Sequence, residues 1–211
     1  MLSIETVVVG VMKTNCFIVY DDANKEALII DPGDDGEYII DFLQKKDLVP
    51  LAILATHGHF DHNLAAFSLK VTLNTPYLIS KKDEFLLKNM RASAKHFLGI
   101  EPDPAPKSDA YLKEGRKITV GKSFFEVIET PGHTPGSICL YNPEEAVIFT
   151  GDLIFKNGSI GRYDFSYSSK ADLIESIDKI MEKPRVTTIY AGHGDETSVG
   201  YERKFHKMDN S

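Results

Sequence analysis

Short apolar runs separated by polar turns dominate the first part of the chain. The runs "IETVVVG", "NCFIVYD" and "EALIIDP", at residues 4–10, 15–21 and 26–32, predict three consecutive strands. The segment "DPG" then breaks the chain. A helix is predicted after it, because apolar side chains recur at helical spacing at Tyr38, Ile39, Phe42 and Leu43.

The middle of the chain continues with a strand, a helix and a loop. The run "LAILAT" at residues 51–56 is continuous rather than alternating, which predicts a strand buried on both faces. A helix is predicted from Ser80, which can cap it, with Asp83 completing a variant capping box and Gly99 ending it. The segment "EPDPAP" at residues 101–106 holds three prolines and predicts a loop, interpreted as a seam between two halves.

A second set of strands follows the proline-rich loop. Four runs predict them: "KITV", "SFFEVIET", "SICLYN" and "AVIFTGD". A helix is predicted from Ser169, with Pro184 just past its end, and "VTTIY" at residues 186–190 predicts a last strand. This order predicts an α/β fold with two β-rich halves covered by helices, although no sequence repeat relates them.

Composition narrows the class of protein. Of the 211 residues, 42% are hydrophobic and 26% charged, which is ordinary for a globular protein with a real core. No apolar stretch is long enough to span a bilayer, and the N-terminus does not read as a signal peptide. Cys16 and Cys139 lie far apart, so we expect reduced thiols and a cytoplasmic location. The net charge of -7 disfavours a nucleic-acid partner.

One heptapeptide, "THGHFDH" at residues 56–62, concentrates the chemistry. It contains three of the seven histidines in the pattern H-x-H-x-D-H, which this composition would produce by chance in roughly 6 of 10,000 such chains. Neutral imidazole is a good ligand for zinc and similar metals. His57 and His59 on an extended segment can hold one ion, and Asp61 with His62 can hold a second. The alternative is a surface or helix-capping cluster.

Two ions need more ligands, and three later segments supply candidates. His133 in "TPGHTPGS", Asp152 in "FTGD" and His193 in "AGHGDET" each follow an apolar strand-like run and lie next to glycine. Each alone is also typical of a surface turn, so the prediction depends on the set. His96 and His206 have no such context and are interpreted as structural or exposed.

Taken in order, these motifs carry a family resemblance. The segments "NCFIVYD", "LIIDPG", "THGHFDH", "TPGHTPGS", "FTGD" and "AGHGDET" resemble a metallo-β-lactamase-fold hydrolase, over about residues 15–203. Within that superfamily the chain is most similar to the short, glyoxalase II-like branch, the hydroxyacylglutathione hydrolases, and "GSIGRYDF" at residues 158–165 supports that placement. The resemblance implies one domain over residues 1–211, folded as a four-layer αββα sandwich with metals at one edge.

The resemblance also implies roles for the ligands. His57, His59 and His133 would hold one divalent ion, Asp61, His62 and His193 a second, and Asp152 would bridge them. Zinc is the expected metal, with iron or manganese open. The implied reaction is hydrolysis of a small thioester or ester, such as S-lactoylglutathione, by a hydroxide that bridges the two ions, with Asp61 and Asp152 as catalytic carboxylates. Asp31 would orient a ligand histidine, or simply end a strand.

Substrate recognition is where the sequence departs from this family. The chain lacks most of the C-terminal helical region with which longer members bind glutathione, and the tyrosine that closely follows their last ligand histidine. Arg162 is the candidate anchor for an anionic substrate, because guanidinium pairs bidentately with carboxylate, or else a surface arginine. Tyr163 and Phe165 are candidates to line the substrate pocket, or core residues.

Other members of the fold remain as alternatives. A persulfide dioxygenase would bind one iron through His57, His133 and Asp152, which this chain also has. A flavodiiron reductase would have Glu at the position of His59, a zinc β-lactamase would not carry a bridging carboxylate like Asp152, and a tRNA-processing nuclease would be more basic. A metal-stabilised binding module would need a closed ligand set, whereas seven ligands shared by two ions leave room for solvent.

Overall fold

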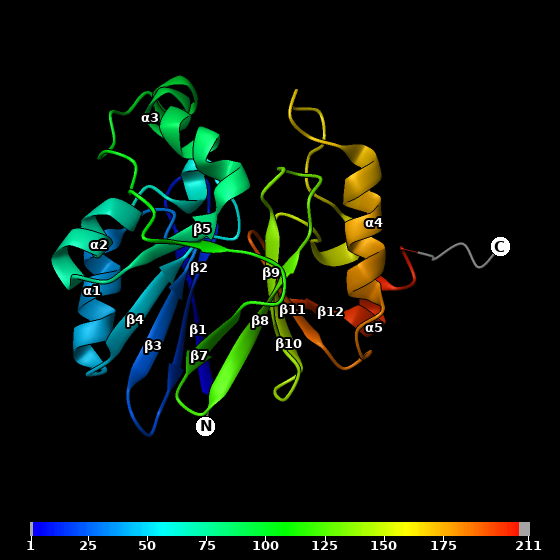
Figure 1. Cartoon of the computed structure of the whole chain (residues 1–211), viewed down its shortest axis with the longest axis horizontal. Coiled ribbons are helices and arrows are strands. Elements are labelled where there is room, and N and C mark those ends of the chain that lie inside the picture. Colours follow the sequence, from blue (N-terminus) through cyan, green and yellow to red (C-terminus); the bar gives the residue numbers. More distant parts are fainter. Residues whose placement is uncertain (1, 207–211) are drawn as a thin grey trace.

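Two six-stranded sheets face each other at the centre of the computed structural model, which describes residues 2–206. Helices cover the outer surface of both sheets, and the two halves lie side by side (Figure 1). The first sheet runs in chain order, β1 (Leu2–Val9), β2 (Thr14–Asp21), β3 (Glu26–Ile30), β4 (Val49–Leu54), β5 (Tyr77–Ser80) and β6 (Ala110–Leu112).

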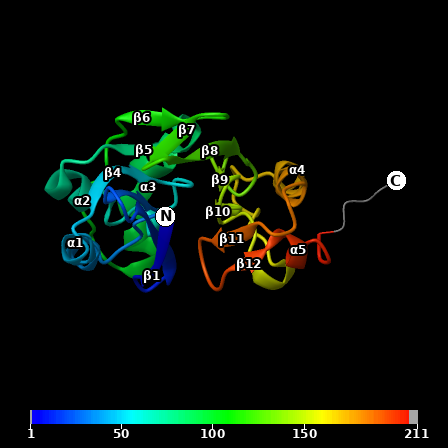
Figure 2. The same cartoon turned by 90° about the horizontal axis from the view of Figure 1, so that it is seen from below.

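The second sheet is built from the C-terminal half and runs in the order β12-β11-β10-β9-β8-β7. Its strands are β7 (Lys117–Val120), β8 (Ser123–Glu129), β9 (Ile138–Asn142), β10 (Val147–Gly151), β11 (Thr188–Ala191) and β12 (Thr197–Ser198). The α-helices are α1 (Gly36–Lys45), α2 (Ala66–Leu73), α3 (Glu84–Leu98), α4 (Lys170–Met181) and α5 (Val199–Glu202). Short 3-10 helices are η1 (Phe60–His62), η2 (Lys81–Asp83) and η3 (Lys156–Gly158). Viewed from below, α1 and α2 lie outside the first sheet, and α4 and α5 outside the second (Figure 2).

Alternation along the strands produces these layers. Successive strand side chains point to opposite faces of a sheet. Along β2, Ile18 belongs to the cluster that packs against Ile39 of α1, whereas its neighbour Phe17 belongs to the cluster between the sheets. There the Phe17 ring lies 4.8 Å from the ring of Phe149 on β10. A third cluster packs β9 and β10 against α4. Because both faces of each sheet are covered, the fold is the αββα sandwich that the resemblance implies.

The topology gathers loop ends at one edge of the sandwich. β3 pairs with β4 in parallel, and β10 pairs with β11 in parallel, so the carboxyl ends within each pair meet at the same edge. A backbone hydrogen bond from Ile138 N–H to the Thr56 carbonyl (2.9 Å) ties the two halves together beside this edge. The segments that follow these strands carry the candidate metal ligands.

Several predictions about elements are confirmed, and others are wrong. All the predicted strands form, and the helix predicted from Ser169 is α4, where Ser169 accepts a hydrogen bond from Asp172 N–H. The helix predicted from Ser80 begins only at Glu84, after η2, which Ser80 caps. The capping box is wrong because the Asp83 side chain makes no cap hydrogen bond; its carboxylate is used between loops, as described below.

The seam and the minor elements also differ from expectation. Residues 101–106 form a loop as predicted, but the chain stays in the first sheet through β6 and crosses to the second sheet only before β7. The elements α2, β5, β6, β12 and α5 were not predicted. No helix among residues 2–206 has the length and apolar character needed to cross a membrane. Cys16 and Cys139 are free and buried, and burial raises the pKa of both thiols, that of Cys139 to about 12.

Candidate metal centre

Seven side chains from both halves of the chain meet at one edge of the sandwich. They form three overlapping groups, in each of which the potential ligand atoms lie within 4.8 Å of one another. The groups are His57, His59 and His133; His57, His62 and Asp152; and Asp61, His62 and His193. All seven predicted ligands therefore converge, although they lie up to 136 positions apart in the sequence, from 57 to 193. Their roles as ligands stay a prediction.

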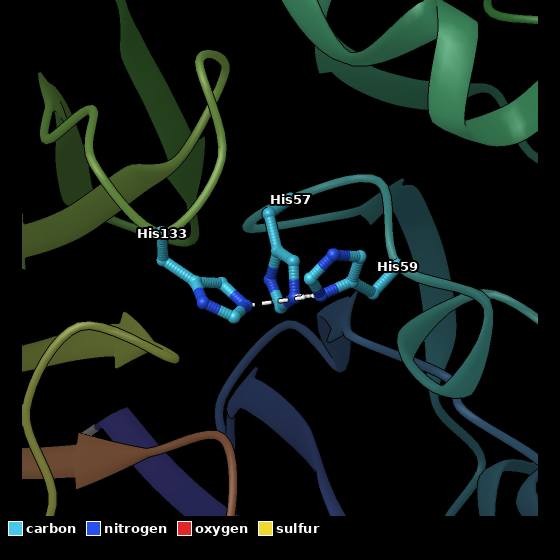
Figure 3. Close-up of side chains that lie close together, drawn as sticks. All are labelled: His57, His59 and His133. Atoms are coloured by element: carbon cyan, nitrogen blue, oxygen red, sulfur yellow. Dashed lines mark hydrogen bonds between the residues drawn. The ribbon is translucent and has the colours of Figure 1, made fainter. Parts of the chain in front are cut away.

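The first group is a tight triangle of imidazole nitrogens. His59 Nδ1 lies 3.1 Å from His57 Nε2 and 2.9 Å from His133 Nε2. Figure 3 shows the three rings, from the segment after β4 and the segment after β8, pointing at one another, with dashed lines along these contacts. Three nitrogens at this separation can surround a single small cation.

Hydrogen bonds on the outer side fix which nitrogen of each ring faces inward. His133 Nδ1 donates to the Arg162 carbonyl at 2.7 Å, and His193 Nδ1 donates to the Lys13 carbonyl at 3.2 Å. A carbonyl oxygen only accepts, so the proton of each neutral ring lies on Nδ1. Each Nε2 then presents a lone pair to the cluster, as a metal ligand requires.

Asp31 holds the proton of His62 on Nδ1 and, through Thr56, does the same for His57. Its Oδ2 accepts from His62 Nδ1 at 3.1 Å and from the Thr56 hydroxyl at 2.6 Å, while Oδ1 accepts from Thr56 N–H at 2.7 Å. Because the Thr56 proton is donated to Asp31, its oxygen accepts from His57 Nδ1, 3.1 Å away. Asp31 is fully buried at a positive φ of 51°, a conformation costly for a non-glycine residue. The orienting role considered for Asp31 matches these contacts.

Asp152 lies between the two halves of the cluster. Its Oδ2 is 3.6 Å from His133 Nε2, and its Oδ1 is 3.4 Å from His62 Nε2 and 3.7 Å from His193 Nε2. Asp61 Oδ2 is 3.4 Å from His193 Nε2. Within residues 2–206, the buried atoms His62 Nε2 and Asp152 Oδ1 have no hydrogen-bond partner. Buried polar atoms without partners are costly, and a cation between them would remove that cost. The residues present thus fit a pair of divalent ions.

The cluster favours a positive charge near His62, where three carboxylates lie close together. Burial lowers the pKa of His57 well below its usual value, and the pKa of His59 to about 3, so both rings are neutral at physiological pH. Burial opposes charge on His62 too, but the carboxylates of Asp152, Asp61 and Asp31 outweigh it and raise the His62 pKa well above its usual value. A cation held between Asp61 and Asp152 would meet the same favourable field.

Two residues that sequence reasoning missed hold the ligand loops in place. The buried Asp83 carboxylate accepts from Gly58 N–H (2.8 Å), between the first two ligand histidines, and from Thr134 Oγ1 (2.6 Å) and Gly136 N–H (2.7 Å), just past His133. Asn63 Nδ2 donates to the carbonyls of His57 and His59, at 3.1 and 2.7 Å. Asp83 is the last residue of η2, three positions after β5 ends at Ser80, and this position close to a strand end is the signal that could have identified it.

The His193 loop is fastened from the other side of the sandwich. Asn15 Nδ2 donates to the Ala191 and Gly194 carbonyls, at 2.9 and 2.8 Å. Gly192, between them, approaches the cluster so closely that a Cβ there would lie 2.4 Å from Asp152 Oδ1 and 2.7 Å from His62 Cε1. The glycine of "AGHGDET" is thus required by space, because a larger side chain would occupy the ligand positions.

The remaining predicted residues lie in different places. Arg162 lines the pocket above the cluster, but its guanidinium makes a bidentate pair with Asp164 at 2.9 Å, and both side chains are exposed. Tyr163 is exposed and is not among the lining residues, whereas Phe165 is. Sequence reasoning missed Tyr167, whose hydroxyl lies 2.9 Å from His59 Nε2.

The two histidines left out of the predicted ligand set stay outside the cluster. His96 is exposed on α3. His206 is partly buried beyond α5, and burial lowers its pKa. Both positions agree with the interpretation of these residues as structural or exposed.

Known proteins are similar to this chain over most of its length. The family model described as "Metallo-beta-lactamase superfamily" matches residues 9–193. An uncharacterized protein of Aquifex aeolicus is 38% identical over 96% of this chain and 95% of its own length. The protein named hydroxyacylglutathione hydrolase GloC of Haemophilus influenzae is 37% identical over 100% of this chain and 99% of its own.

Solved structures with the same fold are also similar to this chain in sequence. The structure described as BLEG-1 B3 metallo-beta-lactamase superposes with a TM-score of 0.89, at 35% identity over 100% of both chains. The protein TTHA1623, described in a di-iron-bound form, superposes with a TM-score of 0.87, at 33% identity over 96% of this chain and 98% of its own. The high coverage shows that the similarity extends over both halves of the sandwich.

Proposed function

The chain belongs to the metallo-beta-lactamase superfamily, and from this premise we propose that it is a hydrolase that binds two divalent metal ions and cleaves a thioester or ester. Membership in the superfamily supports a metal-dependent hydrolase. Our proposal adds the number of ions, the bond that is cleaved and the roles of individual residues. The named hydroxyacylglutathione hydrolase of Haemophilus influenzae supports a thioester as the substrate class, with S-lactoylglutathione as its first representative.

The observation that carries the proposal is the position of Asp152. One of its carboxylate oxygens faces His133 of the three-histidine triangle, and the other faces His62 and His193 of the second group. A carboxylate placed this way can hold an ion with each oxygen and reduces the repulsion between two dications. A single-metal site would leave the group of Asp61, His62 and His193 without a function.

In the proposed reaction, the protein residues hold and orient the reacting groups. When bound, divalent ions supply Lewis-acid polarisation of the carbonyl and an acidified water at neutral pH. Asp152 would hold the ions, and Asp61 lies on the same ligand edge, where its carboxylate can accept the proton of the attacking water. The water oxygen forms a bond to the carbonyl carbon, the carbon–sulfur bond breaks, and the thiolate leaves and takes up a proton from solvent. The products are a carboxylate and a thiol.

Metal counting combined with turnover of S-lactoylglutathione tests this proposal. We expect close to two ions per chain, with zinc as the leading candidate and iron or manganese as alternatives. Replacement of the bridge, Asp152→Ala, should lower both the metal content and the rate of hydrolysis. Asp164→Asn, which changes an exposed carboxylate outside the ligand cluster, is the matched control for metal content.

Other outcomes would replace the proposal. One iron per chain with oxygen uptake on glutathione persulfide would favour a persulfide dioxygenase that uses His57, His133 and Asp152. Full occupancy by two ions in Asp152→Ala would contradict the bridging role. A β-lactam substrate belongs in the same assay, because BLEG-1, at 35% identity, is named a B3 metallo-beta-lactamase.

A further inference from the structure

The pocket above the candidate metal centre is built from apolar and aromatic side chains. It has a volume of about 330 Å³, and its floor is formed by ligand residues including His59, His133 and Asp152. Its walls are Met12, Phe60, Leu86, Phe97, Phe155 and Tyr167. We propose that this pocket binds an apolar group of the substrate, aromatic or aliphatic, attached to the thioester or ester that is cleaved. This inference rests on the proposed function and adds the class of group that the enzyme selects.

The aromatic walls are not simply part of a core. Phe60 of η1 and Phe97 of α3 stack with ring centroids 5.7 Å apart and planes 9° apart, and Phe165 stacks on Tyr167 at 5.2 Å and 10°. The Phe97 side chain is 57% exposed and Met12 is 42% exposed. Large apolar side chains held open to solvent beside a reactive centre indicate a binding surface for an apolar group.

The charged residues on the pocket wall also favour an apolar group over an anionic one. Arg162 is the one Lys or Arg among the residues that line the pocket in the described part of the chain. Its Nε and Nη2 both donate to Asp164, and its Cζ lies 4.5 Å from the centre of the Phe165 ring. A substrate part that carries two carboxylates, such as glutathione, would meet a guanidinium whose charge Asp164 already balances. An apolar group would leave the pair of Arg162 and Asp164 intact.

The size of the cavity sets the size of the group. The cavity volume of about 330 Å³ is many times the roughly 10–15 Å³ that a single water needs on the same measure. A chain of several methylenes or a phenyl ring fits within it. Burial of each methylene contributes about 0.8 kcal/mol, which corresponds to roughly a fourfold gain in kcat/KM when the gain is expressed in the transition state.

The test compares two substrate series on the metal-loaded protein. In the first series, the acyl group of N-acetylcysteamine thioesters is lengthened from acetyl to hexanoyl and phenylacetyl. In the second, the thiol of an acetyl thioester is lengthened, and S-lactoylglutathione is measured beside both. We expect kcat/KM to rise about fourfold per methylene in one series until the cavity is full. The series that rises identifies whether the acyl group or the leaving group occupies the pocket.

Variants localise the effect. Phe97→Ala and Met12→Ser should each reduce the chain-length gain, measured within each variant as the ratio of kcat/KM for the hexanoyl compound to that for the acetyl compound, and Phe97→Lys should reduce it further. Ile100→Ala, an exposed apolar residue outside the lining, is the control and should keep the full gain. Rates that do not change with length in either series, with S-lactoylglutathione the best substrate, would overturn the inference and leave the proposed function standing.

A binding measurement separates the two proposals. Hexanoate and phenylacetate should raise the Tm of the metal-loaded protein more than lactate does at equal concentration, and Phe97→Lys should remove the difference. If no thioester or ester is cleaved, the proposed function fails, while this binding preference still decides whether the pocket accepts apolar carboxylates. Equal shifts for hexanoate and lactate would count against the apolar pocket whatever the activity.

Discussion

The hydroxyl of Tyr167 lies 2.9 Å from Nε2 of His59, on the side of that ring away from the cluster of candidate ligands. Among the five ligand histidines, His59 is the one that points Nδ1 at the other nitrogens, with Nε2 on the outer side. The phenol oxygen can accept the Nε2 proton, which leaves Nδ1 free as a ligand. Tyr167 therefore orients His59 as Asp31 orients His62.

Replacing Tyr167 with Phe should weaken metal binding without unfolding the protein. The loss of an outer hydrogen bond to a ligand histidine typically reduces metal affinity 10- to 100-fold, and we expect about tenfold here. Competition with a chelator measures the affinity. Tyr163→Phe is the control, because Tyr163 is exposed outside the pocket lining. Equal affinities for the two variants would show that the hydroxyl does not orient His59.

Replacing Asp83 with Asn should destabilise the protein. The Asp83 carboxylate accepts hydrogen bonds from two backbone N–H groups and one hydroxyl. In the Asp83→Asn variant, the amide nitrogen that replaces one of the oxygens cannot accept the hydrogen bonds made to that oxygen. Leaving one buried donor without a partner costs about 1–3 kcal/mol in the free energy of unfolding. Chemical denaturation measures the change, with the exposed Asp103→Asn as control. Because Asp83 joins the loops of His57 and His133, metal affinity should fall in the same variant; an unchanged affinity would make Asp83 purely structural.

The outline of the fold was predictable because burial leaves a periodic signal. Both faces of β2 and β10 are buried, so these strands are continuous apolar runs, and α4 carries a polar cap and one apolar stripe. Helix α2 lacks these signals: it begins at Ala66 without a side-chain cap and carries the exposed Val71 among its apolar residues. Strands as short as β12 are fixed by pairing with their neighbours rather than by local propensity.

For the candidate site, too, one part could be predicted from the sequence and another part could not. The candidate metal ligands could be predicted to converge because metal binding requires particular residue types at fixed spacing after strands. The residues that hold them were hidden because a hydrogen-bonding Asp, Asn or Tyr has no characteristic spacing, and the partners meet only in three dimensions. Asp83 satisfied a helix-capping pattern, but the buried N–H groups of two loops took its carboxylate instead. Buried N–H groups far away in the sequence needed a hydrogen-bond acceptor, and that requirement decided the position of the Asp83 side chain rather than the local capping pattern.

Stability at acid pH should depend in part on Asp109. The Lys70 ammonium, helped by the N–H of Tyr77, lowers the pKa of Asp109 below its ordinary value of 3.8. A carboxyl whose folded pKa is depressed contributes stability that is present above its unfolded pKa and lost as the pH falls through the folded pKa. Asp109→Asn should therefore lower the free energy of unfolding at pH 7, and the gap to wild type should narrow below about pH 4. Denaturation at pH 7 and pH 3 measures it; a gap that stays constant with pH would exclude the charge as its cause.

The pair of Arg162 and Asp164 offers a direct test of how anionic substrates are anchored. If Arg162 binds a substrate carboxylate, that carboxylate competes with Asp164, which accepts two hydrogen bonds of 2.9 Å from the same guanidinium. Exposed pairs contribute little to stability, so neither Arg162→Ala nor Asp164→Asn should change the Tm noticeably. Asp164→Asn should lower KM for S-lactoylglutathione several-fold by releasing the guanidinium, and Arg162→Ala should raise it. Both variants should leave KM for an uncharged acetyl thioester unchanged. If KM for the anionic substrate is the same in both variants, Arg162 is not the anchor, and the apolar walls of the pocket carry recognition alone.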